Sequence, residues 1–110
     1  MDKIKIEWGN RNDLAQIAIV ESACFDKYRT AKCIEKVYDN PFNAFLVAKR
    51  KYNNLIGYCQ YEINANAGVL KIEVIGVSPA HRRCGVANAI IECLKERINT
   101  VPYGKMVFNI

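Results

Sequence analysis

Residues 74–94 read VIGVSPAHRRCGVANAIIECL, and this stretch decides the fold. It begins with the small and β-branched residues typical of a strand covered on both faces. Pro79, two arginines and Gly85 then interrupt the chain. Apolar residues recur at helical spacing after this interruption, at Val86, Ala89, Ile90, Cys93, Leu94 and Ile98. The sequence therefore predicts a strand from Val69 to Val77, a turn, and a helix from about Val86 to Ile98.

The turn between this strand and helix predicts an anion site. The first backbone N–H groups of the helix, near Arg83 to Ala87, have no intrahelical acceptor and lie at the positive end of the helix dipole. Gly85 has no side chain to keep an anion away from the backbone. Arg82 and Arg83 add two guanidinium groups, whose geometry matches that of phosphate. We expect a phosphate or pyrophosphate here, although an ordinary solvated turn would have the same composition.

The rest of the chain predicts a sheet with helices on its faces. Residues 4–8 alternate as a half-buried strand, and Asp13, with Gln16 as its reciprocal partner, is expected to cap a helix. Thr30 opens a second helix, which ends before Pro41. Strands are expected at residues 44–49, 55–63, 69–77 and 105–110. The order β-α-α-β-β-β-α-β predicts an α/β (mixed α+β) fold with a mixed, mostly antiparallel sheet, in one domain covering residues 1–110.

The composition excludes several classes of protein but does not identify the function. Of 110 residues, 51% are apolar and 25% are charged, as in ordinary globular domains. No apolar run is long enough to span a bilayer and the N-terminus lacks a signal peptide core, so we expect a cytoplasmic protein. The five cysteines form no C-x-x-C pair and His81 is the one histidine, so neither a metal site nor a disulfide framework is expected. The net charge of +5 is compatible with an anionic ligand.

A family resemblance follows from the turn. The pattern Arg82-x-x-Gly85-x-Ala87, preceded by VSP and an apolar strand, resembles the acetyl-CoA-binding motif Q/R-x-x-G-x-G/A of the GNAT superfamily of N-acetyltransferases. The order of elements from Ile4 onward also matches the family. Residues 21–110 are most similar to members that acetylate protein N-terminal amines, typified by ribosomal-protein alanine N-acetyltransferases. The resemblance implies acetyl-CoA (CoA) as cofactor and a primary amine, such as a protein or peptide N-terminus, as acceptor.

The resemblance also implies roles for individual residues. The backbone N–H groups of Arg83, Cys84, Gly85, Val86 and Ala87 would hold the pyrophosphate of CoA, with Arg82 at the first position of the motif. Ile75, Gly76 and Val77 would lend backbone groups to the pantetheine arm and the thioester. Glu73 is the candidate catalytic base, since strand alternation places it on the same face as Ile75 and Val77. Lys71 shares that face, so an exposed ion pair is the alternative role for Glu73.

The C-terminal end departs from the family pattern. Family members continue after the last strand with a helix, which often supplies a tyrosine acid, and a final hairpin, whereas this chain ends at Ile110. We therefore expect the proton donor to be missing and a homodimer to form through the edge of the strand at residues 105–110. Two alternatives stay open. One is a non-catalytic CoA-binding module that kept the pyrophosphate loop, and the other is a small basic nucleic-acid-binding domain, which the net charge alone supports.

Overall fold

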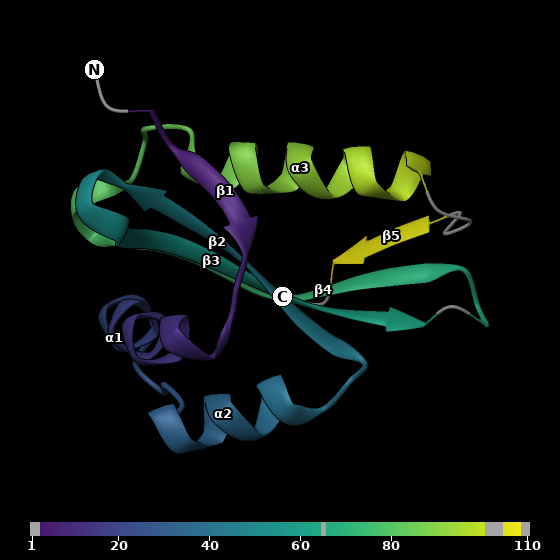
Figure 1. The fold of residues 1–110 in the computed structure, drawn as a ribbon, viewed down its shortest axis with the longest axis horizontal. Helices are drawn as coiled ribbons and strands as arrows, with labels where there is room; N and C mark the ends of the chain where they lie inside the picture. The colour runs from purple at the N-terminus through teal and green to yellow at the C-terminus, as the bar shows by residue number, and fades with distance from the viewer. Residues whose placement is uncertain (1–2, 65, 101–104, 109–110) are drawn as a thin grey trace.

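The computed structural model describes residues 3–64, 66–100 and 105–108. Within these residues, five strands form one sheet in the order β1-β2-β3-β4-β5, flanked by three helices (Figure 1). The strands are β1 (Lys5–Trp8), β2 (Asn43–Arg50), β3 (Asn54–Asn64), β4 (Val69–Val77) and β5 (Lys105–Phe108), and the helices are α1 (Leu14–Cys24), α2 (Ala31–Asp39) and α3 (Val86–Thr100). Neighbouring strands run antiparallel except β4 and β5, which are parallel. The predicted fold class and element order are confirmed.

The helices cover the two faces of the sheet unequally. Helix α3 lies over one face, and α1 and α2 lie over the other (Figure 1). On α3, the apolar stripe buries Val86, Ile90 and Leu94 to 2% exposure or less. Burying side chains of this size stabilises the fold by about 1.5–3 kcal/mol each. On the opposite face, Ile17 of α1 and Ile34 of α2 pack with residues of β2 and β3 in a second core. The central strands are therefore covered on both sides, as their apolar composition predicts.

The start of α1 differs from the sequence-based prediction, whereas the start of α2 agrees with it. Thr30 caps α2 by accepting a hydrogen bond from the backbone of the first turn. Asp13 makes no side-chain cap for α1. Its carboxylate instead accepts from the N–H of Asn10 at 2.9 Å and pairs with Lys49 Nζ at 2.7 Å. Gln16, the expected reciprocal partner, accepts from the backbone of β3. The predicted cap was wrong because Asp13 binds a lysine that lies far away in the sequence.

A bulge interrupts β4 in the middle. The register with β3 shifts so that Tyr61 lies opposite Ile72 but Gln60 lies opposite Val74. Glu73 is therefore the additional residue of a β-bulge, which reverses the order of faces beyond it.

Because of this bulge, the side chain of Glu73 lies on the opposite face of the sheet from the one that simple alternation predicts. Ile72 and Ile75 both pack in the core beneath α3, although they are three residues apart. Lys71 alternates with Ile72 and so lies on the other face, and its Nζ is 3.3 Å from Glu73 Oε1. Glu73 therefore does not share a face with Ile75 and Val77, contrary to simple alternation.

Strands β4 and β5 pair over only part of their length. The described pairs run from Val69↔Lys105 to Ile72↔Phe108. The pairing of β4 with the described part of β5 therefore ends at Ile72. Residues 109 and 110 of the predicted last strand lie outside the described residues. The C-terminal half of β4 thus presents an edge next to the start of α3.

Candidate functional site

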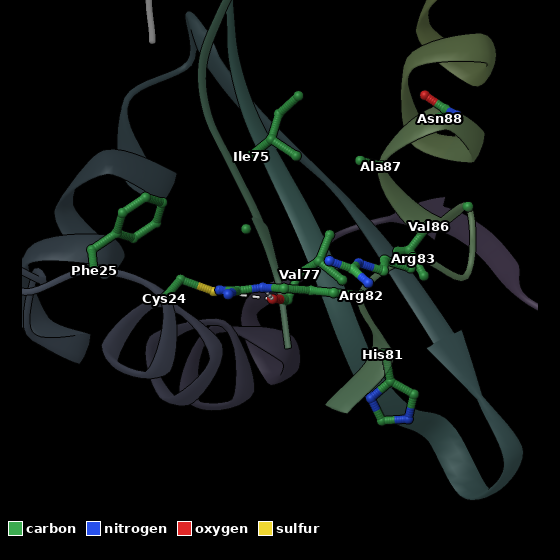
Figure 2. Close-up of a pocket in the computed structure, with 12 residues that line it drawn as sticks. Cys24, Phe25, Ile75, Val77, His81, Arg82, Arg83, Val86, Ala87 and Asn88 are labelled. Atoms are coloured by element: carbon green, nitrogen blue, oxygen red, sulfur yellow. Dashed lines mark hydrogen bonds between the residues drawn. The ribbon is translucent and has the colours of Figure 1, made fainter. Parts of the chain in front are cut away.

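A pocket of about 410 Å³ lies between this edge of β4, the turn that follows it and the start of α3 (Figure 2). We call it the first pocket. Eight of the nine residues predicted to bind the cofactor line it, namely Ile75, Gly76, Val77, Arg82, Arg83, Gly85, Val86 and Ala87. Cys84 belongs to the same turn and is exposed, but it does not line the pocket. Residues from a strand and from a helix N-terminus are thus brought together as the sequence predicts.

The turn presents backbone donors to this pocket. Arg83 and Gly85 have positive φ angles of 64° and 78°. The first helical hydrogen bond runs from the N–H of Ala89 to Gly85 O, at 2.9 Å. The N–H groups of residues 86–88 consequently have no acceptor within the helix. A Cβ on Gly85 would meet no atom within 4 Å, so the space over the backbone is open. This geometry suits an anion that approaches the backbone directly.

The edge of β4 adds further backbone groups. The N–H of Ser78 donates to Ile56 O of β3 at 2.8 Å, whereas Val77 O points away from β3. Because peptide groups alternate along a strand, the N–H of Val77 and both peptide groups of Ile75 also point away from β3. They line the free edge of β4.

Val77 O already has partners of its own. Cys24 Sγ and Arg82 Nε each lie 3.2 Å from it, and both donate to it (Figure 2). The first bond ties the end of α1 to β4, and the second draws the base of the Arg82 side chain toward the strand. Val77 would therefore serve a ligand through its N–H group, since its carbonyl is engaged.

Gly76 is a glycine for a reason that the sequence did not predict. A Cβ at this position would lie 2.6 Å from Cε1 of Tyr58. The ring of Tyr58, which is fully buried, therefore packs directly against the backbone of β4. The close neighbour at Gly76 is thus the ring of Tyr58, and the bulge in β4 lies at Glu73.

A second pocket of about 490 Å³ adjoins the first and contains Glu73. The two pockets share Phe25 and Ile75. Four charged side chains line the second pocket, those of Glu21, Lys27, Arg29 and Glu73. The sequence-based candidate Glu73 thus lies next to the first pocket, even though it faces the other side of the sheet from Ile75.

Glu21 organises one wall of the second pocket. Glu21 is 3% exposed, and its carboxylate accepts from Tyr58 OH at 2.6 Å and from the backbone N–H of Arg29 at 2.7 Å. The guanidinium of Arg29 donates to the same carboxylate, with Nη2 at 2.6 Å from Oε1, and to Gln60. We call these four side chains the Glu21 cluster.

The protonation of this cluster follows from its geometry. Burial opposes ionisation of Glu21, but the hydrogen bonds from Arg29 and Tyr58 outweigh it, so the pKa of Glu21 lies below its ordinary value. Burial, together with the neighbouring Glu21 carboxylate, raises the pKa of Tyr58. The tyrosine therefore stays a hydrogen-bond donor, and the cluster holds one negative and one positive charge at neutral pH.

Eight residues that line these pockets were not among the predicted site residues: Glu21, Cys24, Phe25, Lys27, Arg29, Val74, His81 and Asn88. One signal for Glu21 was present, because a carboxylate stands on the apolar stripe of the first predicted helix and so required a buried partner. No pattern identified that partner. Arg29 lies in the loop after the helix, and Tyr58 lies on a strand whose tyrosines look alike in sequence.

The chain is also similar to known proteins. Residues 14–107 match the model of the acetyltransferase (GNAT) family. No curated protein sequence matches the chain.

Solved structures give the same fold. The chain is similar to ribosomal-protein-S18-alanine N-acetyltransferase from Escherichia coli, with a TM-score of 0.78, 13% identity and 89% of this chain covered. A ribosomal-protein-alanine N-acetyltransferase from Brucella melitensis biovar Abortus 2308 has a TM-score of 0.81, 21% identity and 97% coverage. An aminoglycoside N-acetyltransferase solved in complex with CoA has a TM-score of 0.80, 17% identity and 100% coverage. The chain spans 61%, 80% and 78% of these three proteins, respectively. At such identities the similarity establishes the fold.

Proposed function

The chain belongs to the acetyltransferase (GNAT) family, and we propose that residues 1–110 form one acetyl-CoA-dependent N-acetyltransferase domain. The observation that carries this proposal is the first pocket, where the free amide donors of the turn at Gly85 meet the free edge of β4. A cofactor with a pyrophosphate at one end and an extended, amide-containing arm needs these two features side by side.

The residues of the first pocket fit CoA. The backbone N–H groups of residues 83–87 would bind the pyrophosphate over the open space at Gly85, and the exposed guanidinium of Arg82 would add a charge-assisted hydrogen bond. Cys84 would take part through its backbone only. Ile75 and the N–H of Val77 would pair with the pantetheine arm, Gly76 keeping the strand close to Tyr58. When bound, acetyl-CoA supplies a thioester whose acetyl group passes to an amine.

Glu73 would accept the proton that the ammonium group of the acceptor must lose before its nitrogen can attack the thioester. Its carboxylate lies in the second pocket, beside the Ile75 wall that both pockets share. Lys71 Nζ lies 3.3 Å from Glu73 Oε1 and would hold this carboxylate in place beside the acceptor. The reaction would then form the bond from amine nitrogen to acetyl carbon as the carbon–sulfur bond breaks.

The acceptor we propose is the free amine at a protein or peptide N-terminus. Two of the similar structures are enzymes named for alanine N-acetylation of ribosomal proteins, and a third is named for aminoglycosides. An aminoglycoside is therefore the alternative acceptor to test. The acceptor would enter the second pocket, where the carboxylate of Glu73 attracts a cationic amine.

We further propose that the protein acts in the cytoplasm as a homodimer. Five free cysteines favour a reducing compartment, and no helix in the described part of the chain is long and apolar enough to cross a membrane. Phe108 is 50% exposed on β5, at the end of the sheet, and would be covered by a second copy. A protein that stays monomeric in light scattering, well above micromolar concentration, contradicts the dimer.

The function is tested by binding and then by turnover. Calorimetric titration should show that acetyl-CoA binds, and release of CoA should then be followed with an alanine-starting peptide and with an aminoglycoside. Faster turnover of the peptide supports the proposed acceptor. Binding without turnover of either amine reduces the protein to a CoA-binding module, and failure to bind acetyl-CoA contradicts the proposal as a whole.

A further inference from the structure

The two pockets meet at a single apolar wall. Phe25, which follows α1, and Ile75, on β4, line both of them. Figure 2 shows these two side chains in the lining of the first pocket. The first pocket is bounded by backbone donors and arginines, and the second by carboxylates and cations. If acetyl-CoA occupies the first pocket and the amine occupies the second, the carbonyl carbon of the acetyl group must lie where the two pockets meet. This carbon exchanges its bond to sulfur for a bond to the amine nitrogen. The acyl group would therefore lie against Phe25 and Ile75.

We propose that Phe25 determines the length of the acyl chain that this protein accepts. A methyl group fits against an apolar wall, but a longer acyl chain would have to pass Phe25 into the space that the amine needs. This inference rests on the proposed function, since it presupposes that acyl-CoA occupies the first pocket. It goes beyond that function in assigning the choice among acyl groups to one side chain.

Four hydrogen bonds hold the backbone around Phe25 in place. The N–H of Phe25 donates to Glu21 O at 3.0 Å, which closes the last turn of α1. Directly before it, Cys24 Sγ donates to Val77 O at 3.2 Å, which joins the end of α1 to the edge of β4. Four residues after Phe25, the backbone N–H of Arg29 donates to the Glu21 carboxylate at 2.7 Å, and Tyr58 OH of β3 donates to the same carboxylate at 2.6 Å.

Glu21 thus holds both ends of the loop at residues 25–29, and the anchored backbone sets the position of Phe25. Between the anchors, residues 26–28 are exposed and contribute no wall to the first pocket. Tyr58, whose ring packs on Gly76, ties the same carboxylate to β4. The side chain of Phe25 is 40% exposed, so its position depends on this anchored backbone more than on packing around the ring. A wall held in this way can exclude an additional methylene group.

The proposal predicts a particular pattern of affinities for CoA, acetyl-CoA and butyryl-CoA, measured by calorimetry. The unmodified protein should bind acetyl-CoA about tenfold or more tightly than butyryl-CoA, the size of discrimination that one or two methylene groups give in an apolar pocket. Phe25→Ala should bring this ratio close to one while changing the affinity for CoA itself by less than about twofold. Because Phe25 is partly exposed, the variant should stay folded, and Phe25→Leu should give an intermediate ratio.

A matched control and a positioning variant sharpen the test. Phe42→Ala removes another exposed phenylalanine, 64% exposed and outside both pockets, and should leave the ratio unchanged. Tyr58→Phe keeps the ring on Gly76 but removes one anchor from Glu21, so the ratio should fall by about twofold to threefold.

Two results overturn the inference while the proposed function stands. One is an unmodified protein that binds butyryl-CoA as tightly as acetyl-CoA, and the other is a Phe25→Ala protein that keeps the original ratio. If CoA, acetyl-CoA and butyryl-CoA all fail to bind, the proposed function and this inference fall together.

Discussion

The turn at residues 82–88 and Phe25, the first residue of the loop at residues 25–29, lie on opposite sides of the first pocket (Figure 2). The turn and the loop are nevertheless built by opposite means. The turn is exposed and offers main-chain N–H groups, which its positive φ angles and the helix start leave without partners. The loop is held by side chains, with a buried carboxylate at Glu21 bound by an arginine and a tyrosine. The turn offers its backbone to a ligand, whereas the loop is held in place by a buried charge.

This difference between the turn and the loop determines which amino-acid substitutions each of them tolerates. A backbone site depends on conformation and open space, so most substitutions within it matter little, and those that fill the space matter greatly. A site held by a buried ion pair depends on every partner, because removal of one leaves the other charged and desolvated. The predictions below test this contrast.

The largest effect is expected at Gly85. A glutamate at this position, Gly85→Glu, fills the open space with a carboxylate and displaces the anion from at least two charge-assisted hydrogen bonds. At about 1.5–3 kcal/mol each, their loss weakens CoA binding by about 10²-fold to 10⁴-fold. Gly68→Glu is the matched control, because Gly68 also has a positive φ, of 66°, but lies in the turn before β4. Calorimetry should show normal CoA affinity for Gly68→Glu, and equal losses in the two variants would mean that backbone strain alone is responsible.

Removal of the cation in the Glu21 cluster is expected to have the next largest effect. Arg29→Ala leaves a buried carboxylate without its partner, so the free energy of unfolding should fall by about 3–5 kcal/mol in denaturant titration. Arg11→Ala breaks an exposed ion pair with Glu35 and Asp39 and should lose no more than about 1 kcal/mol. Similar losses in the two variants would contradict a special role for the buried cluster.

A kinetic effect is expected at Glu73. If this residue is the base, Glu73→Gln should lower the rate of acetyl transfer about 100-fold at neutral pH. The defect should shrink as pH rises, because more of the acceptor is then already deprotonated. Lys71→Met serves as the control for the ion pair itself. A pH–rate profile that is the same in Glu73→Gln and the unmodified protein would leave Glu73 as a structural partner of Lys71.

The smallest effect is expected on stability at low pH. The pKa of Glu21 is lowered in the folded protein, so its contribution to stability is complete above the ordinary glutamate pKa of about 4.3 and is lost as pH falls below that value. The difference in unfolding free energy between the unmodified protein and Glu21→Gln should therefore shrink as the pH drops through about 4. A difference that stays constant over this range would mean that Glu21 is not held in its ionised form.

The same contrast explains what could be predicted from the sequence. The turn and the helix after it are local, since an apolar strand, Pro79, Gly85 and the stripe from Val86 are adjacent in the chain, and the structure places them as expected. The Glu21 cluster joins α1, the following loop and β3, and no local pattern records such a junction. The predicted face of Glu73 was wrong for a related reason. The bulge in β4 depends on how β4 pairs with β3, and the alternation of residues along one strand carries no information about that pairing.

The central claim is that the turn after β4 and the free edge of β4 bind CoA through their backbones. The most direct measurement is a titration of isotope-labelled protein with CoA, followed by the shifts of its backbone amide resonances. We predict that the largest shifts fall on residues 83–88 and on Ile75 and Val77, with small shifts on β1 and α2. No saturable shift, or shifts centred on a surface away from the first pocket, would contradict the claim.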